Sequence, residues 1–156
     1  MIKKILTYPE DKEILTQKSQ EVENIEEIKD LIQDLKDTLH ATDSGKGISA
    51  VQIGVLKRVC ICSWGGDEIV MINPVITRNR GNQDFSEGCL SAPGKFKMVP
   101  RAQKVWCTYI DENGDIVYKR SFPIIPIFGI SAFVATIVIL ILVRRNKMIR
   151  KAITAT

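Results

Sequence analysis

Two short runs of the chain contain residue types that can take part in catalysis. The run Glu87–Ser91 reads Glu-Gly-Cys-Leu-Ser, and its Cys89 could present a thiolate to a metal ion. The earlier run Gly45–Gln52 reads Gly-Lys-Gly-Ile-Ser-Ala-Val-Gln, and the side-chain amide of Gln52 could polarise a carbonyl group. Neither residue carries out chemistry alone, so the function depends on the elements that bring both runs to one place.

Both runs resemble signature motifs of the peptide deformylases, metal hydrolases that remove the formyl group from nascent polypeptides. The family's second motif is Glu-Gly-Cys-Leu-Ser, which residues 87–91 match in full. Its first motif is Gly-x-Gly-apolar-Ala-Ala-x-Gln, and Ser49 stands here where alanine is usual. Val51 stands where proline is frequent. Further similarity in residues 5–9, 55–58, 72–74 and 111–114 extends the resemblance over residues 1–120.

The resemblance implies a role for several residues of the two motifs. Cys89 would be the thiolate ligand of an Fe(II) or Zn(II) ion, while the Gln52 side chain and the Leu90 backbone N–H would stabilise the oxyanion. An N-formylmethionyl peptide would bind as an added strand along the backbone of three residues: Lys46, Gly47 and Gly88. Lys46 departs from the family, in which an apolar residue helps to line the methionine pocket.

The family's third motif, His-Glu-x-Asp-His, is absent from these 156 residues. In the family this motif lies on a helix and supplies two further metal ligands and the general base. The only histidine here is His40, and no acidic residue follows Asp115. We interpret His40 as a surface or cap residue, because with Cys89 it would still leave a tetrahedral site two ligands short. We therefore expect very little hydrolysis from the chain alone.

Three hypotheses about function stay open at this point. The chain could be a deformylase-like enzyme that obtains its missing ligands from a second chain, or a disrupted copy of an active enzyme. It could be a non-catalytic, membrane-tethered relative that keeps a peptide-binding groove. It could also be a frameshifted pseudogene product. Metal content separates the first hypothesis from the other two, and stable membrane association separates the second from the third.

Charge and cysteine content narrow the class of protein. The net charge of +4 comes from the C-terminal tail, where five cations stand without any acid: Arg144, Arg145, Lys147, Arg150 and Lys151. The body is nearly neutral, so the charge gives no signal for nucleic-acid binding. Four cysteines without a recognisable secretory signal predict reduced thiols in the cytoplasm. Cys60 and Cys62 could be half of a metal site, but their apolar surroundings favour core positions on one strand face.

The hydrophobic pattern predicts an α+β body with one early helix and several antiparallel strands. Apolar residues recur three and four apart from Ile25 to Leu39, which predicts an amphipathic helix over 25–42 with Asn24 as its N-cap and Ser44-Gly45 as its end. We expect an extended N-terminal segment over 1–7, and a loop over 45–52 that leads into a strand. Strands are predicted over 59–62, 69–72, 75–77, 95–99, 103–110 and 116–118, with turns at 64–67, 73–74, 93–94 and 112–115 and a loop over 78–83.

The composition changes abruptly after residue 121. Residues 122–143 carry no charge, and a helix of that length would measure about 33 Å, enough to cross a membrane. We therefore predict a deformylase-like domain over 1–121, a transmembrane helix over 122–143 and a basic tail over 144–156. The alternative is a fully buried helix, which so small a body could hardly surround. The five tail cations favour a cytosolic C-terminus, whereas the free thiols favour a cytoplasmic body. We therefore predict a single-pass membrane protein with a cytoplasmic body, or a cytoplasmic protein if the segment does not insert.

Overall fold

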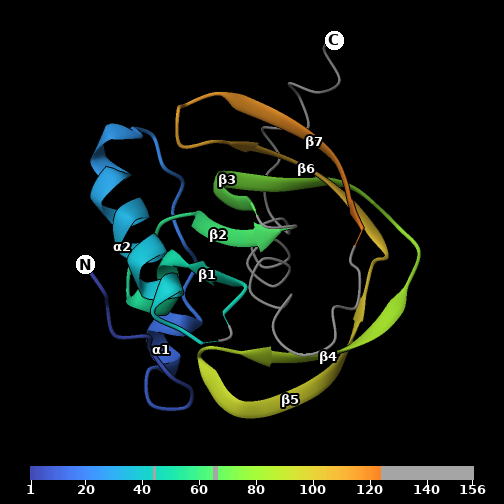
Figure 1. Ribbon diagram of the computed structural model, residues 1–156, viewed down its shortest axis with the longest axis horizontal. Coiled ribbons are helices and arrows are strands. Elements are labelled where there is room, and N and C mark those ends of the chain that lie inside the picture. The colour runs from blue at the N-terminus through green and yellow to red at the C-terminus, as the bar shows by residue number, and fades with distance from the viewer. Residues whose placement is uncertain (44, 65–66, 124–156) are drawn as a thin grey trace.

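A five-stranded antiparallel sheet forms the centre of the molecule, and a separate two-stranded sheet lies below it in Figure 1. The structure is a computed structural model and describes residues 1–43, 45–64 and 67–123. The central sheet has the order β1-β2-β3-β6-β7, with bounds Gly47–Ser49, Val59–Trp64, Asp67–Arg80, Lys104–Ile110 and Ile116–Pro123. The second sheet pairs β4 (Gln83–Cys89) with β5 (Ala92–Arg101). The helices are α1 (Lys12–Leu15), η1 (Glu26–Ile28), α2 (Lys29–His40) and η2 (Ala50–Ile53).

Helix α2 covers one face of the central sheet, as its periodic apolar residues predict (Figure 1). Its buried stripe packs into a core that also includes the inward residues of β1, β2 and β3: Ile48, Val59, Ile61, Val70 and Ile72. The first turn is a 3₁₀ turn, and the Asn24 side chain accepts a hydrogen bond from the Glu26 N–H at 3.1 Å. The helix ends at His40 rather than at the predicted Ser44-Gly45, and the N–H groups of Ala41 and Thr42 close it by donating to the Asp37 and Leu39 carbonyls at 3.1 and 3.0 Å.

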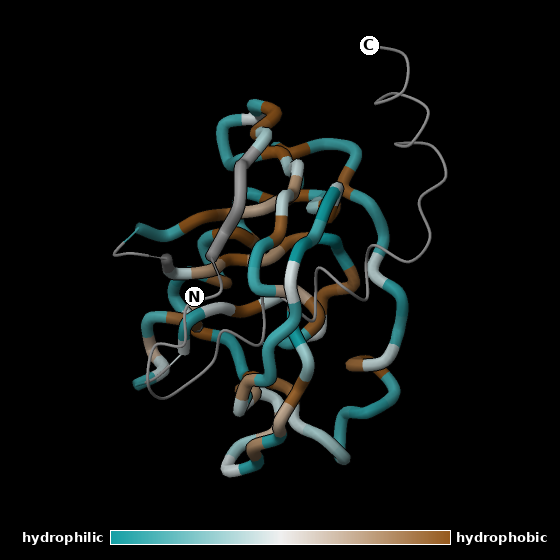
Figure 2. Tube along the Cα trace, turned by 90° about the vertical axis from the view of Figure 1, so that its right-hand side faces the viewer, coloured by the Kyte–Doolittle hydropathy of each residue, from teal (hydrophilic) through white to brown (hydrophobic). Residues whose placement is uncertain are grey.

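The opposite face of the sheet carries a second, smaller core. It gathers the sulfur-containing residues and one tyrosine of β2, β3 and β6: Cys60, Cys62, Met71, Cys107 and Tyr109. All four cysteines of the chain are free thiols. The interpretation of Cys60 and Cys62 as core residues on one strand face is confirmed. Hydrophobic segments, brown in Figure 2, run through the interior of the molecule, while most of the surrounding loops are hydrophilic.

Several predicted turns and loops are strands instead. Residues 47–49 form β1 and residues 50–53 the short helix η2, where a loop was expected. Strand β3 runs through Asn73-Pro74 with an irregular register, because the Asn73 side chain bonds both backbone groups of Val22 at 2.8 and 2.9 Å and holds the kink. The predicted loop over 78–83 reduces to a connection at 81–82, and Pro93-Gly94 lies inside β5. Glycine at 94 suits this place because its φ is +70°.

Strand β7 also corrects the predicted domain boundary. Phe122 and Pro123 pair with Val105 and Lys104 of β6, so the predicted helix does not begin at residue 122. The rest of the predicted transmembrane segment, residues 124–143, and the basic tail lie outside the described residues. Within the described part of the chain, no helix is long and apolar enough to cross a membrane. The membrane span and the location built on it stay predictions.

Candidate functional site

Strand β1 and helix η2 fix the first motif inside the core. Gly47 pairs with Cys62 so closely that a Cβ atom at residue 47 would lie 2.8 Å from the Ile61 carbonyl oxygen, which explains the glycine. Ser49 then caps η2 and binds the side chain of Gln52. The Ser49 backbone N–H donates to the Gln52 Oε1 atom at 3.0 Å, and the Ser49 hydroxyl donates to the same atom at 3.2 Å. Both side chains are buried, so the carbonyl end of the Gln52 amide is fixed.

Strand β4 carries the second motif, and a buried ion pair holds its first residue. The Arg101 guanidinium donates from Nε and Nη2 to the two carboxylate oxygens of Glu87, each at 2.8 Å. Both side chains are almost completely buried, and the pair joins the end of β5 to the middle of β4. Sequence reasoning did not find Arg101. The available signal was that a buried carboxylate in a strand requires a cationic partner.

The two motifs meet through the Gln52 amide nitrogen. Its Nε2 atom donates to the Ser91 hydroxyl oxygen at 3.1 Å and lies 3.9 Å from the Cys89 sulfur. Because Ser49 holds the oxygen end of the amide, the nitrogen end must face Cys89. The structure therefore brings Gln52 and Cys89 together, as the resemblance implied.

The N-terminal segment ties the same two motifs from the other side. Residues 1–7 form neither a helix nor a strand, and the backbone of residues 6–8 contacts both motifs. The Leu6 N–H donates to the Gln52 carbonyl at 2.8 Å, and the Tyr8 N–H donates to the Ser91 carbonyl at 2.8 Å. These two bonds give the N-terminal residues a direct part in positioning the site, a role that sequence reasoning did not assign.

The Cys89 thiol is half-buried at the junction of the motifs, unlike the three buried cysteines of the sheet. Burial raises the pKa of Cys89, and hydrogen bonds from the backbone N–H groups of Ser91 and Ala92 oppose that rise. At neutral pH the uncharged thiol is therefore favoured in this environment. Backbone donors around the sulfur nevertheless provide a setting in which a thiolate could be held.

The three predicted substrate-binding residues lie in different surroundings. Lys46 is exposed, and its carbonyl accepts a hydrogen bond from the Ser63 N–H at 2.8 Å. Gly47 and Gly88 are both buried. A Cβ atom added at Gly47 would face Ile61 and Cys62, whereas one added at Gly88 would face the ring of Phe96. Their role in binding a peptide stays a prediction.

The chain matches one family of known proteins over most of its described length. Residues 2–120 match the family model described as polypeptide deformylase. The chain belongs to the peptide deformylase family. Deformylases depend on a metal and act on formylmethionyl peptides.

Individual deformylases confirm this membership. Peptide deformylase 2 of Clostridium acetobutylicum is 38% identical over 104 residues, which cover 66% of this chain and 69% of that protein. Peptide deformylase of Fusobacterium nucleatum is 40% identical over 119 residues, covering 73% of this chain and 67% of that protein. The crystal structure of a peptide deformylase from Legionella pneumophila superposes with a TM-score of 0.78 at 33% identity, covering 91% of this chain and 81% of that one. The predicted deformylase-like fold is thus confirmed for the body.

The described residues do not supply a set of ligands that fits the deformylase metal. Among residues 1–43, 45–64 and 67–123, no group of three or more His, Cys, Asp or Glu side chains could hold a metal ion. His40 is 66% exposed, and its Nε2 atom lies 2.7 Å from a carboxylate oxygen of Glu68, which agrees with a surface role. A single thiolate falls short of the three protein ligands of a catalytic zinc site. The role of Cys89 as a metal ligand stays a prediction.

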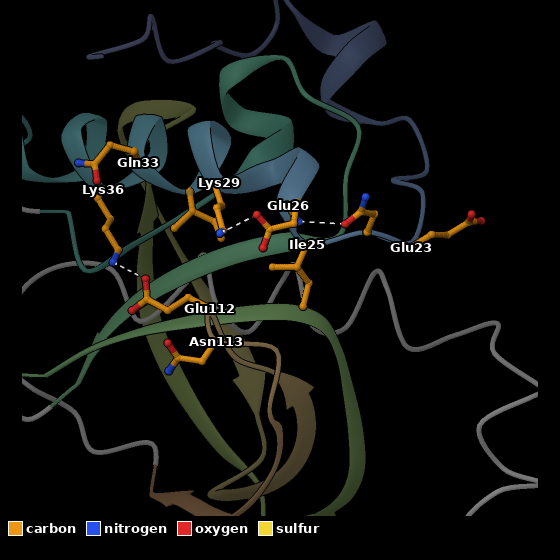
Figure 3. Close-up of a pocket in the computed structure, with 10 residues that line it drawn as sticks. Glu23, Ile25, Glu26, Lys29, Gln33, Lys36, Glu112 and Asn113 are labelled. Atoms are coloured by element: carbon orange, nitrogen blue, oxygen red, sulfur yellow. Dashed lines mark hydrogen bonds and ion pairs between the residues drawn. The ribbon is translucent and has the colours of Figure 1, made fainter.

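A hollow of about 730 Å³ lies between the start of α2 and the turn that joins β6 to β7 (Figure 3). Its cations are paired with acids, Lys29 with Glu26 and Lys36 with Glu112, each at 2.7 Å. No residue of either motif lines it. This charged hollow is therefore separate from the site that the motifs form.

Proposed function

We propose that this deformylase relative binds N-formylmethionyl peptides at the junction of its two motifs and does not hydrolyse them with these residues alone. The orientation of the Gln52 amide is the observation that supports this proposal. Its oxygen is occupied by two donors from Ser49, so its nitrogen is the end that remains for a ligand. A donor fixed in this way suits the oxygen of a formyl group.

The Gln52 nitrogen has one N–H that a ligand can take over. An amide NH₂ group carries two hydrogen atoms, and one of them serves the Ser91 hydroxyl at 3.1 Å. The other hydrogen atom is directed toward the Cys89 sulfur, which lies 3.9 Å from the Nε2 atom, so this contact is weak. A formyl oxygen placed beside Cys89 would accept a stronger hydrogen bond from this N–H. The Leu90 backbone N–H, next in the chain, would be the second donor by family resemblance.

Hydrolysis needs more than these donors. In the family reaction a metal activates water and a base takes its proton, and the metal needs three protein ligands. The chain has one histidine, which is exposed and paired with Glu68. The proposal therefore separates recognition of the formyl group, for which Gln52 is held in place, from cleavage, for which ligands would have to come from elsewhere.

Calorimetric titration with three peptides tests the recognition step. Formyl-Met-Ala-Ser should bind about tenfold more tightly than Met-Ala-Ser, which lacks the formyl oxygen, because one well-placed hydrogen bond is worth about 1.4 kcal/mol. Acetyl-Met-Ala-Ser keeps a carbonyl oxygen and should bind less tightly than the formyl peptide only through the steric effect of its additional methyl group. The variant Gln52→Met keeps the side-chain length and should remove the preference for the formyl group. Gln33→Met, at an exposed position of α2, is the matched control and should keep it. Equal affinity of the native chain for the three peptides would contradict the proposal.

A further inference from the structure

Three cations lie close together at one end of strands β3 and β6. Arg78 pairs with Trp106, and Arg80 pairs with Lys104 two residues farther along both strands. Because side chains alternate along a strand, these four residues share one face of the central sheet. All three cations are exposed, and the Arg78 guanidinium lies over the Trp106 ring, 5.0 Å from its centroid. We name these four residues the basic face.

The strands of the basic face carry no acid near its cations. Asp67 and Glu68, at the opposite end of β3, are the only acids in the sequences of β3, β6 and β7. Within the part of the chain that the structure describes, none of the three cations forms an ion pair. Lys29 and Lys36, by contrast, each have a carboxylate oxygen 2.7 Å away. The basic face is therefore complementary in charge to an anionic partner.

Aromatic side chains accompany the cations. Trp106 is half-buried under Arg78. Tyr118 of β7 pairs with Thr108, two residues from Trp106 along β6, so it lies on the same face of the sheet. It is 73% exposed. Trp and Tyr are enriched where proteins meet the headgroup layer of a membrane, because each has an apolar body and a polar tip.

The basic face lies beside the point where the apolar run of the sequence begins. Lys104 pairs with Arg80 on one side and with Pro123 on the other, so these three residues form one row across β3, β6 and β7. Residues 124–143 follow Pro123 directly, and their sequence contains no charged residue. Cations and aromatic side chains beside the start of an apolar run are the combination that suits an anionic membrane surface.

We propose that the basic face binds the anionic headgroups of a membrane surface. Each of its cations contributes about fivefold to the affinity for such a surface. A single-stranded RNA fits less well, because bases stack on open aromatic rings and Arg78 already covers one side of the Trp106 ring. The inference does not depend on the proposed function, since the basic face contains no residue of either motif. It places the body on the anionic side of the membrane, which is the cytoplasmic leaflet.

Co-sedimentation of the full chain with two kinds of vesicle tests the proposal. The anionic preference is the affinity for phosphatidylcholine vesicles with about 30% phosphatidylglycerol, divided by the affinity for pure phosphatidylcholine vesicles. The double variant Arg80→Gln with Lys104→Gln should lower this preference about 25-fold, because each cation contributes about fivefold. Lys12→Gln with Lys18→Gln removes two exposed cations at and after α1 and is the matched control, which should keep the preference. The cations of the C-terminal tail are the same in both double variants, so their contribution cancels.

Three outcomes would overturn the proposal. Equal affinity of the native chain for both kinds of vesicle would mean that no anionic surface is recognised. Equal loss of preference in the two double variants would mean that net charge, and not the basic face, determines binding. Titration with a single-stranded uridine oligonucleotide covers the other class of partner. Loss of RNA binding in Arg80→Gln with Lys104→Gln, with the anionic preference unchanged, would make the basic face an RNA-binding surface and contradict the proposal.

Discussion

The two motifs are held in place by different kinds of interaction. The first motif lies in the core under α2, where its residues Ile48 and Ala50 are fully buried. The second lies in a two-stranded sheet with an exposed apolar face, and its position depends on the Glu87–Arg101 pair and on hydrogen bonds to Ser91. The backbone that carries Gln52 is thus positioned by hydrophobic packing, whereas the position of Cys89 depends on a few polar contacts. The two regions should respond differently to mutation.

The largest effect is expected from breaking the ion pair of the second region. Glu87→Ala leaves the Arg101 guanidinium buried without its carboxylate partner, which should cost about 3–5 kcal/mol of the free energy of unfolding. Urea denaturation measures this loss. Glu26→Ala removes the carboxylate of an exposed ion pair with Lys29 and is the control, with little change expected. A loss below about 1 kcal/mol for Glu87→Ala would show that the pair does not hold the second motif.

The first region should instead tolerate changes that keep its volume. Ile48→Ala creates a cavity under α2 and should cost about 2–5 kcal/mol, whereas Ile48→Leu should cost less than about 1.5 kcal/mol. In the second region even a substitution that keeps the volume should lower the free energy of unfolding. Glu87→Gln is such a substitution, because it removes the charge that Arg101 requires. Urea denaturation of the three variants checks this contrast. Equal losses for Ile48→Leu and Ile48→Ala would contradict packing as the cause.

The smallest expected effect is a dependence of the free energy of unfolding on pH. It arises from Cys60 on β2, the strand that pairs with the first motif. Cys60 pairs with Ser49, and burial raises the pKa of its thiol above the ordinary value of 9.0. A raised pKa in the folded state gives stability that is complete below the unfolded-state pKa and declines as the pH rises above it. One such group lowers the free energy of unfolding by about 1.4 kcal/mol per pH unit there.

Cys60→Ala isolates this contribution. Urea denaturation at about pH 8 and about pH 10 should show a smaller decline for the variant than for the native chain, because the variant has no thiol to ionise. Cys89→Ala is the control, since its thiol is only half-buried and should change the decline less. Identical declines for the native chain and Cys60→Ala would mean that the buried thiol does not contribute.

Local patterns in the sequence predicted the parts of the fold that local forces determine. The apolar spacing from Ile25 to Leu39 identified α2, and alternation identified most of the strands. Proline and glycine predicted turns at Asn73-Pro74 and Pro93-Gly94, and both predictions were wrong because strands continue through these positions. At the first of these, the bonds from Asn73 to Val22 join residues far apart in the sequence and outweigh the local preference. No local pattern contains that information.

The candidate site shows the same limit. The motifs identified Gln52 and Cys89, whose Nε2 and sulfur atoms lie 3.9 Å apart, and the roles of both residues stay predictions. Arg101 and Phe96 were missed because each acts through a partner across the β4–β5 sheet, Glu87 for one and Gly88 for the other. The register of that sheet depends on a hairpin whose turn was predicted at Pro93-Gly94 rather than at Leu90-Ser91. With the turn misplaced, neither partnership could be predicted.

Metal content and formate release, measured together, test most directly whether the chain recognises formylated peptides without cleaving them. The purified chain is incubated with formyl-Met-Ala-Ser under anaerobic conditions with excess Fe(II), and bound iron and released formate are quantified. We expect far less than one iron per chain and no formate above background. Stoichiometric iron with formate release that Cys89→Ala abolishes would contradict this expectation, because the missing ligands would then be supplied and the chain would be a working deformylase.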